Sequence, residues 1–284
     1  FPERSRGAAA SSDSGATPLD FARGTLASVC AAHSKQKSRF EFRLGVVGET
    51  AEELGAGLKS FLEGKESPTV FTRRAAEGSR EKVAFVFSGQ GGQHWQMGRQ
   101  LFASEPLFRQ TVEQIDALLK KLGWGSLIEE LQKDEQSSRM GETQIAQPAL
   151  FALEVGIARL LMAHGVTPSA LVGHSIGELG AAHLSGALTL EEATRIVYWR
   201  SRCQAQAENK GAMAAIGLPE AEVGKLLKPY GGKIEIAAIN GPAAITVAGT
   251  TPEVEALVAS LEAKSVFALR LNVSVPFHCR LMDP

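Results

Sequence analysis

Short apolar runs alternate with longer segments of helical spacing through the middle of the chain. The apolar runs are residues 82–87 and 170–172, and each leads into a turn that contains glycine. Helical spacing of the hydrophobic positions covers most of the remainder, namely residues 97–102, 107–122, 126–131, 147–164 and 190–207. Pro148 lies at the start of the longest of these segments, where a helix tolerates proline. The alternation predicts an α/β core with a mostly parallel sheet.

The hydrophobic pattern changes within residues 212–273. Strand-like and helical segments follow one another there in the order β-α-β-β-α-β, at residues 212–218, 220–227, 233–239, 243–249, 252–263 and 266–273. This order is typical of a ferredoxin-like subdomain. We expect it to be inserted beside the α/β core, with the cleft between the two lobes as the place for a ligand.

The first 80 residues differ from the rest. Residues 1–38 are rich in Ser, Ala and Gly and predict a linker with a short helix around 18–33. Residues 39–47 alternate like a strand and residues 51–62 have helical spacing, which predicts a small βα unit. The expected organisation is therefore a linker and βα subdomain at 1–80, a large α/β core at 81–210, the small subdomain at 211–274 and a return to the core at 275–284.

Composition narrows the class of protein. Of the 284 residues, 44% are hydrophobic and 21% are charged, as in ordinary globular domains. A net charge of −1 gives no electrostatic footprint for nucleic acid or for an anionic membrane. Three widely spaced cysteines and the absence of C-x-x-C or H-E-x-x-H motifs argue against a disulfide framework and against a metal site. They favour a reducing, cytoplasmic setting.

We also expect no membrane anchor. The sequence has no signal-peptide pattern, and we find no apolar run near the ~18 residues that a spanning helix needs. The chain starts with Phe1 instead of an initiator methionine, so we expect it to be a piece of a longer polypeptide.

The strongest chemical motif is G-x-S-x-G at Gly173, Ser175 and Gly177. An apolar strand precedes it and a helical pattern follows, which is the context of a nucleophile elbow. The glycines permit a cramped backbone that lifts the serine clear of the sheet. The helix N-terminus then directs amide N–H groups at an oxyanion formed there. The pattern predicts Ser175 as a nucleophile.

A nucleophilic serine needs a base, which is usually histidine. Among six histidines, His278 follows the last strand of the small subdomain, in Val-Pro-Phe-His, where a rigid segment returns the chain to the cleft. His278 is therefore a candidate base, with a purely structural histidine as the alternative. The side chain of His174 is expected in the cleft wall or the core, and His183 is expected to point away from the serine.

Two further features have competing interpretations. The glycine-rich turn at residues 88–93 has three interpretations: a phosphate-binding loop, a plain tight turn, or an oxyanion loop. In the third, the N–H groups of Gln90 and Ile176 both donate to the oxyanion. No lysine follows in a P-loop pattern, which disfavours the first interpretation. Arg200, on a helical run, is either a solvated surface residue or a bidentate clamp for a substrate carboxylate.

Taken together, these motifs resemble the acyltransferase domain of modular polyketide synthases and the related malonyl-CoA:acyl carrier protein transacylases. The resemblance covers residues 82–284 and rests on ordered motifs: F-S-G-Q-G-G-Q at 87–93, T-Q-I-A-Q-P-A-L at 143–150, G-H-S-I-G-E at 173–178, G-A-M-A-A at 211–215, N-G-P at 240–242 and V-P-F-H at 275–278. The leading βα unit resembles the linker that joins a ketosynthase to its acyltransferase.

The resemblance implies a site and a reaction. Its residues are the catalytic Ser175 and His278, the oxyanion donors Gln90 and Ile176, and the substrate-contacting Arg200, His174, Gln147, Phe277 and Asn240. The implied enzyme has no bound cofactor or metal. It takes an acyl group from malonyl-CoA and delivers it to the phosphopantetheine arm of an acyl carrier protein, beside a ketosynthase in the same polypeptide. Such domains serve polyketide antibiotic or fatty acid biosynthesis.

Two departures from the family pattern qualify this expectation. The chain ends at Pro284, soon after His278, whereas the family domain continues, so the part that orients the histidine is expected beyond this sequence. The tetrad V-P-F-H is neither the H-A-F-H typical of malonyl-selective members nor the Y-A-S-H typical of methylmalonyl-selective ones. The bulk of Phe277, together with Ile176, favours malonyl, with methylmalonyl as the alternative.

Two other interpretations remain open from the sequence. A serine hydrolase or thioesterase needs an acid to orient the histidine, for example Glu191, Glu220 or Glu235, although none has an obvious placement at a strand end. A non-enzymatic docking role fits only the first 80 residues.

Overall fold

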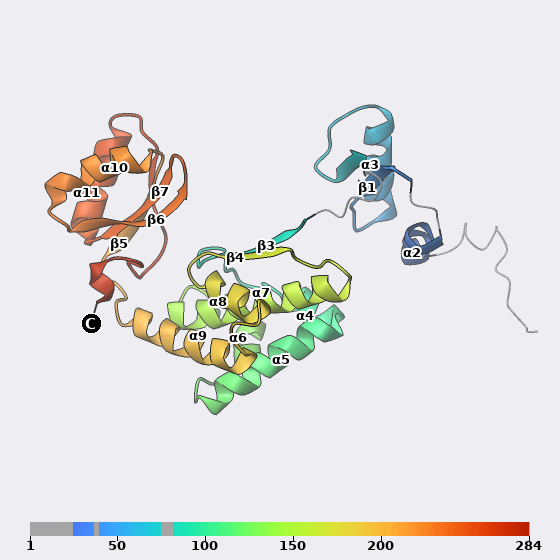
Figure 1. Cartoon of the computed structure of the whole chain (residues 1–284), viewed down its shortest axis with the longest axis horizontal. Helices are drawn as coiled ribbons and strands as arrows, with labels where there is room; N and C mark the ends of the chain where they lie inside the picture. Colours follow the sequence, from blue (N-terminus) through green and yellow to red (C-terminus); the bar gives the residue numbers. More distant parts are fainter. Residues whose placement is uncertain (1–24, 37–39, 75–81, 284) are drawn as a thin grey trace, which may run out of the picture. The chain divides into compact units, whose positions relative to one another are not determined.

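The computed structural model describes residues 25–36, 40–74 and 82–283 (Figure 1). They fall into two compact units, Phe1–Glu81 and Lys82–Pro284. The elements of the first unit are α2 (Leu26–Gln36), β1 (Phe42–Val46), α3 (Ala51–Leu62) and β2 (Val70–Arg74). The predicted linker at 1–24, and with it the start of the predicted short helix, lies outside the described residues.

Strand β1 of the first unit pairs with a strand that the sequence analysis did not predict. β1 and β2 are antiparallel, with Phe42 opposite Arg74 and Val46 opposite Val70. Helix α3 follows β1 closely because Gly57 has no side chain: a Cβ there would lie 2.5 Å from the Cγ1 of Val46. The predicted βα unit is therefore a β-α-β unit with an antiparallel pair.

The second unit begins with an α/β lobe. Its elements are β3 (Ala84–Phe87), α4 (Arg99–Ser104), α5 (Pro106–Lys121), α6 (Leu127–Gln132), α7 (Thr143–Ala163), β4 (Ala170–Gly173), α8 (Gly177–Leu184) and α9 (Leu190–Ala205). β3 and β4 pair in parallel, from Ala84 opposite Ala170 to Phe87 opposite Gly173. The sequence predicted both strands, but it did not predict that they form a sheet of only two strands among the described residues. Between them the described chain forms four helices, so the expected mostly parallel sheet is reduced to one parallel pair.

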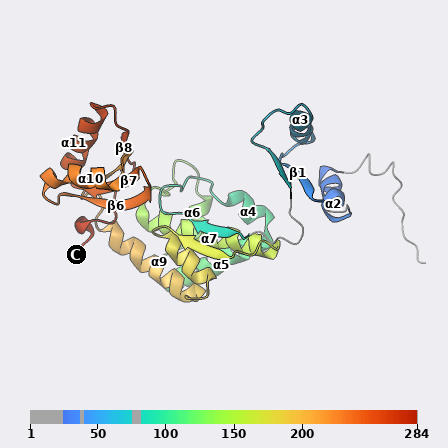
Figure 2. The ribbon, with the colours of Figure 1, turned by 45° about the horizontal axis from the view of Figure 1, so that its top comes forward.

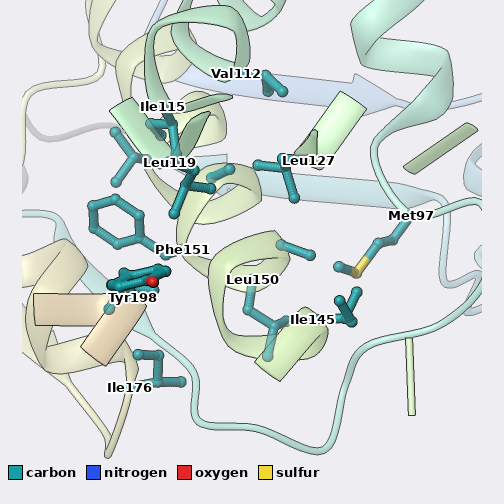
Figure 3. Packing of buried hydrophobic residues seen from close by; sticks show 14 of the residues in the cluster. Met97, Val112, Ile115, Leu119, Leu127, Ile145, Leu150, Phe151, Ile176 and Tyr198 are labelled. Atoms are coloured by element: carbon teal, nitrogen blue, oxygen red, sulfur yellow. The ribbon is translucent and has the colours of Figure 1, made fainter. Parts of the chain in front are cut away.

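Helices α5, α7 and α9 enclose the core of this lobe. The α5 side chains Val112, Ile115 and Leu119 are fully buried, at 0% exposure. They share one cluster with Phe151 of α7 and Tyr198 of α9, and Figure 3 shows these side chains directed into a common interior. The spacing of three and four residues along α5 places them on one helix face.

Helix α7 begins four residues before the predicted start, which puts Pro148 inside the helix. Proline has no N–H, so it cannot donate to the carbonyl of Gln144 one turn earlier. The indole N–H of Trp124 donates to that carbonyl instead, over 3.2 Å. The expectation that Pro148 starts the helix was wrong because a side chain from the loop after α5 satisfies the backbone group that proline leaves open.

Helix α7 also corrects the expectation that no apolar segment is long enough to span a membrane. Within the described residues it is the one helix long and apolar enough to cross a membrane, by length and composition alone. Its 21 residues include buried positions on every side, and 61% of its most apolar window is buried inside the protein. A helix that is apolar all round is typical of the centre of a domain as well as of a membrane. We describe α7 as the core helix of this lobe.

The remaining elements form a four-stranded antiparallel sheet with two helices. They are β5 (Ala212–Ile216), α10 (Glu220–Leu227), a 3₁₀ turn (Lys228–Tyr230), β6 (Ile234–Gly241), β7 (Ala244–Gly249), α11 (Thr251–Glu262), β8 (Ala268–Arg270) and a final 3₁₀ turn (Arg280–Met282). The strand order is β6-β7-β5-β8. Alternate β5 residues share one hydrophobic cluster with α10 and α11. Figure 2 shows these two helices next to strands β6, β7 and β8 of the sheet. Met213 and Ala215 lie on the opposite face, which lines a cavity.

We expect Trp124→Phe to lower the free energy of unfolding by about 1–3 kcal/mol, because the Gln144 carbonyl then loses its donor. Adding Pro148→Ala should restore much of this loss, since alanine supplies the missing N–H. Denaturant unfolding of the two single variants and the double variant measures the coupling. Additive effects of the two changes would contradict this account.

Candidate active site

The site is built around a tight turn between β4 and α8. Ser175 has φ = +53°, in the left-handed region that side chains rarely adopt. Close packing enforces the turn: a Cβ on Gly173 would lie 2.3 Å from the Cα of Glu178, and one on Gly177 would lie 2.3 Å from the Phe87 carbonyl oxygen. Only glycine fits at either position. Ser175 is thereby held at the end of the parallel strands and the start of a helix.

Ser175 and His278 meet, although 103 residues separate them. The distance from Ser175 Oγ to His278 Nε2 is 2.9 Å. His278 also has a positive φ, +59°, in the loop that follows β8. Just after it, the backbone N–H and guanidinium of Arg280 donate to both carboxylate oxygens of Glu235 on β6, over 2.7–3.0 Å. This bridge fixes the loop that carries the histidine.

The surroundings lower the pKa of His278 below its usual value. The main cause is burial of the ring, and the positive charge of Arg200 and the neighbouring His174 lower it further, while Glu178 acts in the opposite direction. A lowered pKa keeps the imidazole neutral, which is the form able to accept a proton.

Arg200 also reaches the serine. Its Nη2 donates to Ser175 Oγ over 3.0 Å and its Nη1 donates to Gln147 Oε1 over 2.7 Å. Gln147 is 1% exposed. Burial lowers the pKa of Arg200, and the charge of Glu178 partly offsets this. Arg200 is half-buried and its guanidinium bonds to Gln147 and Ser175, so it is not the solvated surface residue considered above.

The glycine-rich turn lies against the elbow. Within the described part of the chain, neither the Gln90 N–H nor the Ile176 N–H has a hydrogen-bond acceptor. The Gln90 side chain is held by Thr143 Oγ1, over 3.3 Å, and by the Gln147 amide, over 3.2 Å. These contacts hold the Gln90 side chain against α7, and Gln90 lines the same cavity as Ser175.

The start of this turn is tied to the core helix. Ser88 donates its N–H and its hydroxyl to Glu154 Oε1 over 2.7 and 2.8 Å. Burial raises the pKa of Glu154, and the two Ser88 hydrogen bonds oppose that change. Its other carboxylate oxygen is buried and has no partner among the described residues. The turn is therefore anchored two residues before Gln90.

A cavity of about 350 Å³ joins the elbow to the open face of the four-stranded sheet. The sequence-predicted residues that line it are Gln90, Gln147, His174, Ser175, Asn240, Phe277 and His278. Asn240 donates its amide to Thr246 Oγ1 over 3.0 Å, which orients it at the cavity wall. Ile176 is 1% exposed and is not among the residues that line the cavity. His183 bonds to Arg159 and the Leu188 carbonyl, away from the serine.

Sequence reasoning missed several residues of the site. Thr143 and Gln204 support the amides of Gln90 and Gln147, and Glu235 holds the histidine loop through Arg280. Gln204 follows Arg200 by four residues on one helix, a spacing that places both on the same face and was a usable signal. No comparable signal connected Glu235 with Arg280. In the described ranges, no group of three or more His, Cys, Asp or Glu residues is placed to hold a metal ion.

The profile of the family described as "Acyl transferase domain" matches residues 84–284. The chain belongs to this family. It is 36% identical over 250 residues to polyketide synthase GfsE of Streptomyces halstedii, a match that covers 86% of this chain and 7% of that synthase. The chain thus spans a small part of the curated relatives that it matches.

Solved structures agree with this assignment. The acyltransferase domain from the second module of the salinomycin polyketide synthase superposes with a TM-score of 0.73 at 34% identity, covering 94% of this chain and 62% of that one. The malonyl CoA-acyl carrier protein transacylase from Coxiella burnetii superposes with a TM-score of 0.66 at 34% identity, covering 72% and 65%. The chain is thus an acyltransferase domain with an α/β fold.

We expect the rate of serine acylation to fall as the pH drops through the pKa of His278, because the base must be neutral. This acid limb should lie below pH ~6.5, the ordinary histidine value. In Arg200→Ala one cause of the lowered pKa is removed, so the limb should move to higher pH. The pH profile of acylation by acetyl-CoA, which does not need a carboxylate clamp, measures both enzymes. A limb that stays fixed or moves to lower pH would contradict this assignment.

Proposed function

We propose that this domain transfers a malonyl-type acyl group from coenzyme A to the phosphopantetheine thiol of an acyl carrier protein through an ester on Ser175. One observation carries the proposal. Ser175 Oγ bonds at the same time to His278 Nε2, at 2.9 Å, and to Arg200 Nη2, at 3.0 Å. A base and a carboxylate-binding cation therefore meet at a strained nucleophile.

The first half-reaction forms the ester. His278 takes the hydroxyl proton while Ser175 Oγ bonds to the thioester carbonyl carbon, and the carbonyl electrons move to its oxygen. The N–H groups of Gln90 and Ile176 hold this oxyanion. The C–S bond then breaks, and His278 returns the proton to the departing CoA thiolate.

The second half-reaction reverses these roles. The phosphopantetheine thiol gives its proton to His278 and attacks the ester carbonyl in the same oxyanion site. The C–O bond to Ser175 breaks, and the proton returns to Ser175 Oγ. The acyl group leaves on the carrier protein, which completes a ping-pong cycle without a cofactor.

Arg200 selects the acyl group. Its guanidinium is partly buried and pairs only with neutral partners among the described residues, Gln147 and the serine hydroxyl. The carboxylate of a dicarboxylic acyl chain can take the Nη2 donor from Ser175, which pairs the charge and frees the nucleophile. Acetyl groups cannot do this.

The cavity supports a small extender unit. Phe277 is 7% exposed and lines the space beside His278. A methyl branch on the acyl chain has to be accommodated against this ring, which favours malonyl over methylmalonyl. A single methyl group contributes about 1–3 kcal/mol, so the preference is graded and not absolute.

The wider assignment follows from the same family. We propose that the four-stranded lobe, with its β-α-β-β-α-β order, is a ferredoxin-like subdomain and that residues 81–210 form a hydrolase-like core. We propose that the domain works in the cytoplasm inside a polyketide synthase, with residues 1–80 as the linker to a ketosynthase. The supporting observation is that its relative GfsE is a polyketide synthase of which the match covers 7%.

The geometry gives less support to a serine hydrolase or thioesterase. Among the described residues, no carboxylate hydrogen-bonds to His278. Glu235, the acid considered for that role from sequence, pairs with Arg280 instead. The described part of the site therefore contains a Ser-His pair without a carboxylate bonded to the histidine, unlike an α/β-hydrolase triad.

Brief mixing with equal malonyl-CoA and methylmalonyl-CoA should give a malonyl adduct on the wild-type protein and none on Ser175→Ala. Intact-protein mass spectrometry distinguishes the two adducts by one methylene. An adduct on Ser175→Ala would contradict the nucleophile. A methylmalonyl adduct would retain the reaction class but contradict the role of Phe277.

Arg200→Ala should lower kcat/KM for malonyl-CoA by about 30- to 160-fold, since about 2–3 kcal/mol of charge pairing with the substrate is lost. Transfer from acetyl-CoA should be unchanged or improved. Steady-state transfer to an acyl carrier protein with each donor measures the ratio. An unchanged preference for malonyl would contradict the clamp.

A further inference from the structure

Helix α9 presents two groups to the same buried amide. Arg200 Nη1 donates to Gln147 Oε1 over 2.7 Å, and Gln204 Oε1 accepts from Gln147 Nε2 over 2.7 Å. Gln204 lies four residues after Arg200, so one helix turn separates the donor from the acceptor. The two ends of the Gln147 amide therefore match two residues of a single helix face.

The orientation of this amide decides what Arg200 can do. A primary amide has an acceptor oxygen at one end and two donor hydrogens at the other, and a half-turn exchanges them. With the oxygen toward Arg200, the guanidinium is held beside Ser175. With the nitrogen toward Arg200, two donors would face each other in a site that is 1% exposed at Gln147, and water could not relieve the conflict.

Gln204 supplies the shorter of the two bonds that fix this orientation. The Gln147 Nε2 also donates to Gln90 Oε1, but over 3.2 Å, and Gln90 is itself held by Thr143. Gln204 is less buried than Gln147 and its oxygen comes from the helix that carries Arg200. Gln204 therefore ties the Gln147 amide to α9, the helix that also carries the Arg200 guanidinium.

We propose that Gln204 is a positioning residue for extender-unit selection. By accepting from Gln147 Nε2, it keeps Gln147 Oε1 directed at Arg200 and so keeps the guanidinium poised for a substrate carboxylate. The role rests on the acyl transfer proposed above. Gln204 contacts neither the serine nor the histidine among the described residues, and it acts through Gln147 and Arg200 alone.

The test compares Gln204→Leu with Gln206→Leu. Gln206 is the same residue type two positions on, at the exposed end of the same helix, and it makes no side-chain hydrogen bond in the described structure. For Gln204→Leu we expect kcat/KM with malonyl-CoA to fall by about five- to tenfold, the effect of one lost hydrogen bond. The fall should come through KM, and the acetyl-CoA values should not change. Gln206→Leu should match wild type with both donors.

Gln204→Glu provides a second, independent variant. The carboxylate still accepts from Gln147 Nε2, but it places a negative charge one turn from Arg200, where it competes with the substrate carboxylate. We expect KM for malonyl-CoA to rise at low salt and to recover partly at high salt, with little change for acetyl-CoA. Thermal unfolding of each variant separates these effects from loss of fold.

The outcomes separate the two proposals. Equal malonyl-to-acetyl ratios in wild type, Gln204→Leu and Gln204→Glu would overturn the role of Gln204. A loss of both activities in proportion, at unchanged stability, would also overturn it, because that pattern indicates a general effect on the site. If the wild-type protein itself forms no malonyl ester, the proposed function fails, whatever Gln204 does.

Discussion

The close contact between two backbone segments at Gly177 is the constraint on which the site depends. A Cβ there would lie 2.3 Å from the Phe87 carbonyl oxygen and 2.6 Å from that of Ser88. The end of β3 can therefore lie directly on the start of α8. This contact sets the distance between the turn that carries Gln90 and the elbow that carries Ile176. In the function that we propose, the amides of Gln90 and Ile176, 86 residues apart, serve one oxyanion, and the lack of a side chain at Gly177 permits the close approach that this needs.

The electrostatics of the site depend on the fact that the groups hydrogen-bonded to Arg200 are neutral. A buried cation is costly when it is unpaired, and most proteins place a carboxylate beside it. Here the described partners are an amide and a hydroxyl, which accept two of its hydrogen bonds but do not neutralise its charge. The same charge helps to lower the pKa of His278. Arg200 thus adds to the effect of burial in keeping His278 neutral, and in the proposed function its charge is the one that a dicarboxylic acyl group neutralises.

Local patterns predicted most of the fold, and contacts distant in sequence account for the rest. Helix α10 has the bounds that its spacing predicted. A local motif pointed to each of Ser175, His278 and Arg200, and the structure brings the three side chains together. Pro148 was misplaced because its tolerance depends on Trp124, 24 residues earlier. Strand β2 was missed because its sequence, V-F-T-R-R, does not alternate between apolar and polar residues, and most of these residues are exposed. The Gln147–Gln204 bond joins two helices, so the spacing of Arg200 and Gln204 on one helix face could suggest that they act together but could not identify Gln147 as their common partner.

The position of His278 depends on a weak interaction, the bridge between Arg280 and Glu235. The Arg280–Glu235 bridge is partly solvent-exposed, and such pairs contribute about 0–1 kcal/mol to stability. It nevertheless includes the Arg280 backbone N–H, so it fixes the main chain two residues after the histidine relative to β6. His278 has a positive φ that an unrestrained loop would readily leave. A small free energy is enough here, because the bridge only has to favour one loop conformation over others of similar stability. In the favoured conformation, His278 Nε2 lies 2.9 Å from Ser175 Oγ.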